Sequence, residues 1–404
     1  MLLKLAWRNL LRNKRRSSIV LGSIIVGVIA ILFMDAFMLG WMNQMLRNQI
    51  SLNTAHVQIH KNGFNDNKVT QNFMPDYHEV EKIIESNNNV THFSKRTITF
   101  GLLSSASNSS GVYVYGVDPE QEANVSLIKA SIVEGTYLTG ADREITMGTQ
   151  LAEKLSVGLG DKVVVMVNTP DGSIGSDVFR IVGLFKTVSS DYDKSYIYVN
   201  LPNAQRMMEI GDNIYEYAIV VNDYNNANLV RDQIKAQLDD RYEVFSYVDL
   251  LPMLVMQVEM MDEFMGIFYF IIGLAMIFGI INVMLMAVFE RIHEFGVLTS
   301  IGMRAKKLFA MVITEAAALG VLGTIIGVIL GALILWPLSI HGINLVDFAS
   351  SLNSVGIGSI IYPELILTKV IATLILIPFM TIIGAIYPAY KAIKFEPVYA
   401  LRYV

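Results

Sequence analysis

Two carboxylates lie inside otherwise apolar stretches of the sequence, where a charge is costly and therefore informative. Asp35 is the one charged residue between Ser17 and Trp41, and Glu315 is the one between Leu308 and Trp336. A carboxylate in the middle of a bilayer costs about 2.5–3.5 kcal/mol on insertion scales, and such residues often mark functional sites. Asp35 is near the end of its stretch, so we expect it at a membrane interface, close to polar headgroups. Glu315 is about two turns into its stretch, where it either binds Arg291 or Arg304 or extends toward water.

Sequence patterns that support catalysis, nucleotide binding or metal binding are missing. The chain has no cysteine and no G-x-x-x-x-G-K-[ST], H-E-x-x-H, G-x-S-x-G or G-x-G-x-x-G pattern. His56 and His60 share a strand-like stretch, and on one face of a strand a separation of four residues is too long for one metal ion. We therefore expect no catalytic residue, no metal site and no cofactor in this chain.

The hydrophobic residues are concentrated in four stretches. They make up 53% of the 404 residues, whereas charged residues make up 17%, against about 25% in an ordinary soluble domain. Each stretch exceeds the roughly 20 apolar residues that a membrane helix needs. The first is too long and too polar at its flanks for a cleaved signal peptide. We predict four transmembrane helices, at residues 17–41, 264–289, 308–336 and 370–390.

Lysine and arginine predict the orientation of these helices. Six of them lie in residues 1–16, four in the loop 290–307 and three in the tail 391–404, but none lies between 337 and 368. Basic residues favour the cytoplasmic side, so both termini and the 290–307 loop are expected there. Residues 42–263 and the loop 337–369 are expected outside. The spacing of Leu3, Trp7 and Leu10 also predicts an interfacial amphipathic helix over residues 1–16, although a plain basic flank has the same composition.

Residues 42–263 have the composition of a soluble domain. They contain 17 Lys+Arg and 29 Asp+Glu, a net charge of −12, which leaves +7 for the rest of a chain whose total is −5. Such an acidic domain argues against nucleic-acid binding. Alternating and helical patterns predict an α+β domain. Strands are expected at 55–60, 112–115, 162–165, 179–182 and 196–199, and helices at 76–85, 148–155, 202–210 and 227–238.

One turn of this domain is a candidate binding element. Thr169, Pro170, Asp171 and Gly172 follow Asn168 between two predicted strands. Proline presets φ and glycine permits positive φ, so the segment is a strong turn signal. It either projects as a docking element or is a plain hairpin turn.

Methionine and aromatic residues recur at helical spacing where the domain joins the first two membrane helices. Methionine side chains adapt to differing apolar partners, acyl chains among them. These residues form either a lipid-binding or substrate-binding groove or an ordinary helix–helix contact. The candidate groove comprises Met34, Phe37, Met38, Trp41, Met42, Met256, Met260, Phe264 and Phe268, with Met261 and Met265 beside it.

Three segments together resemble the FtsX/MacB/Lol family of ABC transporter permeases, also called type VII or mechanotransmission transporters. They are residues 5–16 (LAWRNLLRNKRR), residues 290–303 (ERIHEFGVLTSIGM) with Glu315 after them, and residues 387–403, which contain YPAYKA and EPVYALRY. Their order and spacing fit the family across the whole chain. Phe295 stands where the family often has Ile, and Thr299-Ser300 where Arg-Ala is common.

The resemblance implies a complex of two permease subunits, identical or homologous, and two cytoplasmic ATP-binding subunits. ATP and Mg would be bound by those subunits, so this chain itself would not be an enzyme. It also implies that the 290–307 segment contains a coupling helix that sits in a cleft of the ATPase. The residues expected there are Glu290, Arg291, Glu294, Gly296, Gly302 and Arg304.

Residues 185–206 are similar to the Lol branch, whose members release lipoproteins from the bacterial inner membrane to a periplasmic chaperone. In that branch the chaperone docks on a hook, which residues 169–172 would provide, and Asp35 could meet a lipoprotein amine. The MacB pump has an ATPase fused ahead of its first span, which is not seen here, and FtsX has a smaller outer domain. MacB-like efflux of a peptide, toxin or antibiotic and FtsX-like signalling to a cell-wall hydrolase remain the alternatives.

Overall fold

The computed structural model describes residues 14–68, 70–74, 76–346 and 358–394, which belong to two compact units. Among the described residues, the helical unit comprises those in 14–42, 258–344 and 360–394, and the sheet unit comprises those in 43–257, 345–346 and 358–359. Most of the predicted amphipathic helix 1–16 and the tail motif after residue 394 lie outside the described residues.

In the described part of the chain, four helices are long and apolar enough to cross a membrane. They are α2 (Lys14–Gln49), α10 (Pro252–Glu290), α12 (Ala305–His341) and α14 (Leu367–Ile393). Each contains one predicted span and runs beyond it. The 36 residues of α2 correspond to about 54 Å, well over the roughly 30 Å of a hydrocarbon core. This helix therefore runs unbroken from the helical unit into the sheet unit.

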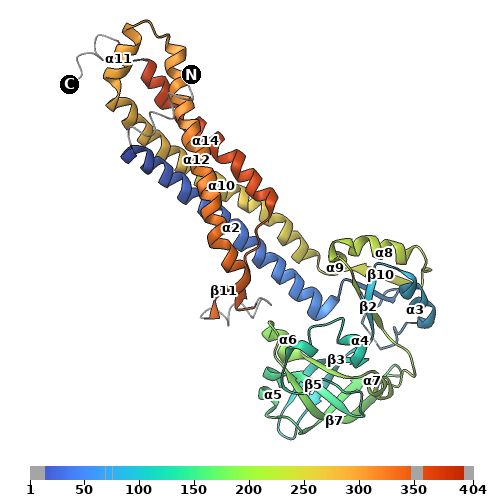
Figure 1. The fold of residues 1–404 in the computed structure, drawn as a ribbon. Helices are drawn as coiled ribbons and strands as arrows, with labels where there is room; N and C mark the ends of the chain where they lie inside the picture. Colours follow the sequence, from blue (N-terminus) through green and yellow to red (C-terminus); the bar gives the residue numbers. More distant parts are fainter. Residues whose placement is uncertain (1–13, 69, 75, 347–357, 395–404) are drawn as a thin grey trace. The chain divides into compact units, whose positions relative to one another are not determined.

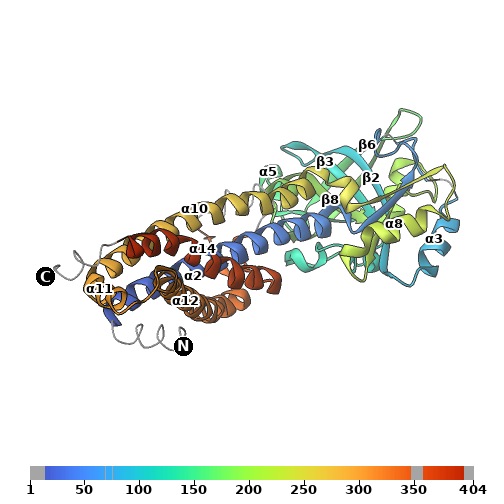
Figure 2. The same cartoon turned by 90° about the horizontal axis from the view of Figure 1, so that it is seen from above.

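The helical unit carries a short element at each end. Helix α11 (Ile292–Ser300) joins α10 to α12, and a two-residue pairing of β11 (Ile343–Asn344) with β12 (Ile360–Ile361) lies at the opposite end (Figure 1). Seen from above, α2, α10, α12 and α14 lie side by side (Figure 2). The backbone N–H of Glu364 donates to the carbonyl of Ala36 at 2.8 Å, so the segment before α14 is fastened to α2.

A glycine stripe brings α12 against α2. A Cβ added at Gly323, Gly327 or Gly331 would lie 2.7, 2.8 or 3.1 Å from the nearest atom, and those atoms belong to Ile24, Val28 and Leu32 of α2. Small residues at such spacing let membrane helices approach closely. A displacement of α12 would therefore press directly on α2.

The sheet unit contains a closed ring of strands. Within the ring the order is β2–β3–β8–β5–β7–β6 and back to β2, with β3–β8 and β5–β7 parallel and the other pairs antiparallel. Its apolar interior includes Val114, Phe179 and Ile197. The strands are β2 (Val90–Ser104), β3 (Ser109–Val117), β5 (Glu144–Gly148), β6 (Lys162–Asn168), β7 (Ile174–Phe185) and β8 (Tyr196–Asn200), with β4 (Ile132–Gly135) added at β7.

A second lobe extends from the same long strand. The first half of β2 pairs with β9 (Glu216–Val221), which continues to β1 (Val57–Lys61) and β10 (Tyr242–Ser246). Helices α3 (Tyr77–Ser86) and α8 (Ala227–Lys235) contribute to the core of this lobe. In register, Arg96 of β2 lies opposite both Glu216 and Val117, which places it where the lobe meets the ring.

The predicted α+β domain between the first two membrane helices is confirmed. Every strand and helix expected from the sequence is present within a few residues of its predicted position. The residue patterns did not predict β2, β4, β5, β9 and β10, nor the helices α4 (Pro119–Glu122), α6 (Ser190–Ser195) and α9 (Tyr247–Leu250). Helices α5 (Thr149–Leu155) and α7 (Leu201–Met208) are two of those that were expected.

Candidate functional site

The candidate coupling segment is held to the bundle by a buried ion pair. Arg291 and Glu315 are 8% and 3% exposed, and an Arg291 guanidinium nitrogen lies 2.9 Å from a Glu315 carboxylate oxygen. The Nε of Arg291 donates to Glu294 at 2.9 Å, and the guanidinium lies 5.5 Å from the ring centre of Phe295. Of the two bases considered as partners for Glu315, the structure selects Arg291, and Arg304 is exposed. The pair links the start of α11 to α12.

The other side of α11 is open. His293, Val297 and Ser300 are exposed at helical spacing, and Ile301 is 79% exposed just after the helix. Gly302 has a φ of 96°, a conformation that glycine adopts without strain. Of the other predicted coupling residues, Glu290 is exposed and Gly296 is buried against the bundle.

Only part of the predicted methionine groove comes together. Met38 and Met42 of α2 line a pocket of about 90 Å³ with Met261 and Met265 of α10. Met256, Met260 and Phe264 are instead 60%, 43% and 58% exposed and do not line it. The face of α10 that enters the pocket is therefore offset from the one that was predicted. Of the remaining candidates, Phe37 and Trp41 contact each other on α2, and Met34 and Phe268 are half-buried outside the pocket.

Polar groups lie at the same pocket. Asp35 lines it, is 7% exposed and accepts a hydrogen bond from the Tyr269 hydroxyl. Asp35 thus contacts a side chain of α10, and its carboxylate is buried within the helical unit. Lys369 and Glu364 complete the lining beside Leu365. The pocket combines adaptable apolar walls with charges of both signs.

A second apolar pocket, of about 550 Å³, was not predicted. Its walls come from the end of α12 and from the segment before α14, with Trp336, Leu333, Pro363 and Leu365 among them. Leu365 lines both pockets. A tryptophan at the end of a span is the signal that could have found this site, because tryptophan is enriched at membrane interfaces.

The candidate hook is a compact hairpin turn closed by its own hydrogen bonds. The backbone N–H of Gly172 donates to the Thr169 carbonyl, and that of Thr169 donates to the Ser173 carbonyl, both at 3.0 Å. The Thr169 hydroxyl donates to the Asp171 carboxylate at 2.5 Å, which with further bonds from Ser173 lowers the pKa of Asp171 to about 2. The Pro170 carbonyl accepts from Gln71 at 2.8 Å. Beside this turn, Ile174 and Phe100 are 71% and 61% exposed.

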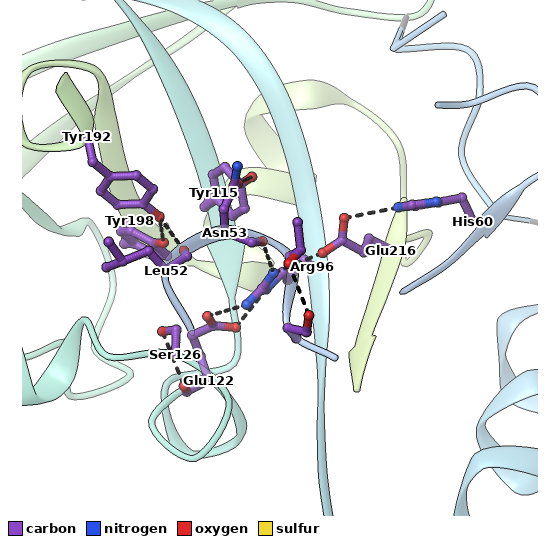
Figure 3. Close-up of polar contacts among 12 residues, drawn as sticks. Leu52, Asn53, His60, Arg96, Tyr115, Glu122, Ser126, Tyr192, Tyr198 and Glu216 are labelled. Atoms are coloured by element: carbon purple, nitrogen blue, oxygen red, sulfur yellow. Dashed lines mark hydrogen bonds and ion pairs between the residues drawn. The ribbon is translucent and has the colours of Figure 1, made fainter. Parts of the chain in front are cut away.

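A buried ionic cluster in the sheet unit escaped the sequence analysis (Figure 3). Arg96 is 1% exposed, and its guanidinium binds both carboxylate oxygens of Glu122 at 2.9 and 2.7 Å and one of Glu216 at 2.9 Å. The other Glu216 oxygen lies 3.0 Å from Nε2 of His60. Burial alone would lower the pKa of Arg96, but the two carboxylates more than offset it and raise the pKa well above its usual value. Likewise, burial would raise the pKa of Glu216, but His60 and Arg96 lower it.

The two histidines that had been considered as metal ligands have separate structural partners. His60 belongs to this ionic cluster, whereas Nδ1 of His56 accepts the backbone N–H of Val221 at 2.9 Å. Among the described residues, no group of three His, Cys, Asp or Glu side chains could hold a metal ion.

Two protein families match the chain. The MacB-like periplasmic core domain matches residues 17–237, and the FtsX-like permease C-terminal matches residues 266–397. The lipoprotein-releasing system transmembrane protein LolC of Neisseria meningitidis is 24% identical over 98% of this chain and 99% of its own length. LolC of Xylella fastidiosa is also 24% identical, over 71% of this chain and 72% of its own length.

A relative from the MacB group is similar over less of its length. The macrolide export ATP-binding/permease protein MacB of Nitrobacter winogradskyi is 25% identical over 67% of this chain and 41% of its own length. Among solved structures, the periplasmic region of MacB from Actinobacillus actinomycetemcomitans superposes with a TM-score of 0.38 at 15% identity, covering 52% of this chain and 97% of that one.

The first family match alone covers more than half of the 404 residues, and the second covers the membrane helices that follow. Together the two matched ranges contain the candidate coupling segment, the glycine-packed helices and nearly all of the inserted domain described above. The chain belongs to the family of ABC transporter permeases of the LolC, MacB and FtsX type, with four candidate membrane helices and a MacB-like periplasmic domain between the first and the second.

Proposed function

We propose that this chain converts ATP hydrolysis in a separate subunit into movement of its periplasmic domain, and that this movement releases lipoproteins from the inner membrane to a periplasmic chaperone. The observation that carries the proposal is an unbroken series of contacts. Arg291 binds Glu315 of α12, the glycines of α12 contact α2, and α2 continues into the sheet unit. The three links are a buried ion pair, a close approach of two helices and a continuous helix. Such tightly packed links deform little, so a displacement of α11 would be passed on to α2.

The orientation in this proposal rests on basic residues. Arg291, Arg304, Lys306 and Lys307 surround α11, and the positive-inside tendency places them, and both termini, in the cytoplasm. There the exposed side of α11, with Val297 and Ile301, would contact one of two ATP-binding subunits that hold ATP and Mg. A second permease subunit completes the complex.

A lipoprotein cargo agrees with the outer pockets. Diacylated or triacylated proteins present flexible chains, which methionine walls accommodate well, and an amine or amide near the lipid anchor can meet Asp35. The match to LolC over nearly the full length of both chains supports this cargo. The turn at Thr169–Ser173, with Ile174 and Phe100 exposed beside it, is the proposed docking surface of the chaperone. Export of a peptide, toxin or antibiotic is the alternative that the MacB-like core domain favours.

The proposal is tested in proteoliposomes that contain this chain, its co-purifying ATPase and any second permease. With ATP and a soluble periplasmic chaperone, a fluorescent lipoprotein should appear in the soluble fraction, and ADP should not replace ATP. ATP hydrolysis without any release would contradict the lipoprotein cargo and favour the efflux or signalling alternatives.

The ion pair at the coupling segment should be required for coupling. Removing one member of a buried pair leaves the other charge unpaired and costs about 3–5 kcal/mol. Arg291→Met should therefore lower both the midpoint of thermal unfolding and the amount of lipoprotein released per ATP. The double variant Arg291→Met/Glu315→Met should regain stability, because no charge remains buried, but not coupling. Lys306→Met, at an exposed base of the same loop that is not among the predicted coupling residues, is the control, and equal losses for Lys306→Met and Arg291→Met would refute the assignment.

Filling the methionine pocket should block the cargo. Met265, 5% exposed, points into the pocket, whereas Met286 on the same helix is 63% exposed. Met265→Trp should reduce the lipoprotein that co-purifies with the complex in the absence of ATP, because the larger ring occupies the space between α2 and α10. Met286→Trp should leave it unchanged. If both variants retain the cargo equally, the pocket does not bind it.

A further inference from the structure

Helix α2 ends in an unusual way inside the sheet unit. After Gln49 the chain forms a π-helical turn, Ile50–Thr54, and then Ala55 takes a φ of 52°. π-Helical turns are rare and occur often at functional sites, and a positive φ is unfavourable for a residue that has a Cβ. The surrounding structure must therefore stabilise this turn.

Three donors from different parts of the domain bind consecutive carbonyls of the turn. The backbone N–H of Leu127 donates to Ser51 at 3.2 Å, and the Tyr192 hydroxyl donates to Leu52 at 2.9 Å. A guanidinium nitrogen of Arg96 donates to Asn53 at 3.2 Å. Carbonyls at a helix end lack partners within the helix, so these donors satisfy groups that would otherwise be unpaired and fix the turn in place.

The donors are themselves held rigidly. Glu122 and Glu216 orient Arg96 from α4 and β9, and Figure 3 shows the cluster converging on Leu52 and Asn53. Tyr192 stacks on Tyr196 with ring centres 3.8 Å apart, and its hydroxyl also binds that of Tyr198. The Tyr115 hydroxyl reaches the side chain of Asn53 at 3.4 Å. The turn is thus fastened to the β-ring and, through Glu216, to the second lobe.

We propose that Arg96 and Tyr192 are positioning residues for transport, which lock the end of α2 to the domain so that the two move as one rigid body. This inference rests on the proposed function only in that ATP hydrolysis displaces α2. If the joint is rigid, the conformational changes of the transport cycle must occur elsewhere in the complex.

The chain contains no cysteine, so spin labels attach within it only at the cysteines that are introduced. One label is placed at Arg47→Cys, which is exposed on α2, and the other at Asn108→Cys, which is exposed in the turn between β2 and β3. The distance between the two labels, measured in the assembled complex, reports any movement across the joint. We expect one narrow distance distribution, the same without nucleotide and in the vanadate-trapped state. A distance that changes between the two states would make the joint a hinge and overturn the proposal.

Two matched tyrosine variants separate clamping from general stability. Tyr192→Phe loses a buried hydroxyl bond to a carbonyl at the joint, together with the bond to the Tyr198 hydroxyl. Tyr215→Phe loses a hydroxyl bond to the Thr70 carbonyl, away from the joint. Both should lower the thermal midpoint. Only Tyr192→Phe should broaden the distance distribution and raise the ATP consumed per released molecule.

An unchanged distribution in Tyr192→Phe, or equal broadening in both variants, would overturn the clamp. A wild-type complex that hydrolyses ATP but releases no lipoprotein would instead contradict the proposed cargo, and the distance measurement would still decide the rigid joint.

Discussion

A guanidinium that is 1% exposed keeps its charge only if the protein surrounds it with acceptors, and the sheet unit is assembled around that requirement of Arg96. Its partners are Glu122 of α4, Glu216 of β9 and the Asn53 carbonyl of the π-helical turn. These elements lie far apart in the sequence, and each supplies an acceptor that no local structure could. The ion cluster thereby fixes the β-ring, the second lobe and the end of α2 at one point.

The same constraint applies in the helical unit, where an apolar surrounding makes an unpaired charge still more costly. Glu315 is bonded to Arg291, so the angle and register of α11 against α12 are set by one ion pair. Asp35 accepts a hydrogen bond from the Tyr269 hydroxyl, and this bond holds α2 against α10. Both buried acids thus connect helices that the proposed cycle would displace, and the glycine stripe of α12 adds a third connection, formed by close packing alone. Stiff contacts of this kind suit a subunit that transmits force.

Sequence periodicity was sufficient to predict the four membrane helices, because each is a long apolar stretch. It was also sufficient to predict strands such as β3 and β8, because their apolar residues alternate clearly on one face. It was insufficient for β2, whose first half carries Thr91, His92, Lys95 and Arg96 and is stabilised by neighbouring strands rather than by its own pattern. Glu315 was recognised, because a charge in an apolar stretch is a local signal. The Arg96 cluster was not, since its members lie up to 156 residues apart between His60 and Glu216. Only some of the predicted groove residues line one pocket, because the direction in which α10 faces depends on packing against α2.

In the proposed cycle, α2 carries movement from the membrane to the periplasmic domain because it is one stiff helix. The most direct measurement inserts Gly-Ser-Gly-Ser between Met42 and Asn43, where the helix passes from one unit to the other, and follows ATP hydrolysis and lipoprotein release in the same proteoliposomes. The identical insert at the exposed turn before Ser109 is the control. We expect the α2 insert to preserve hydrolysis and abolish release, and the control insert to preserve both. Release at the wild-type rate with α2 interrupted would contradict this role of α2.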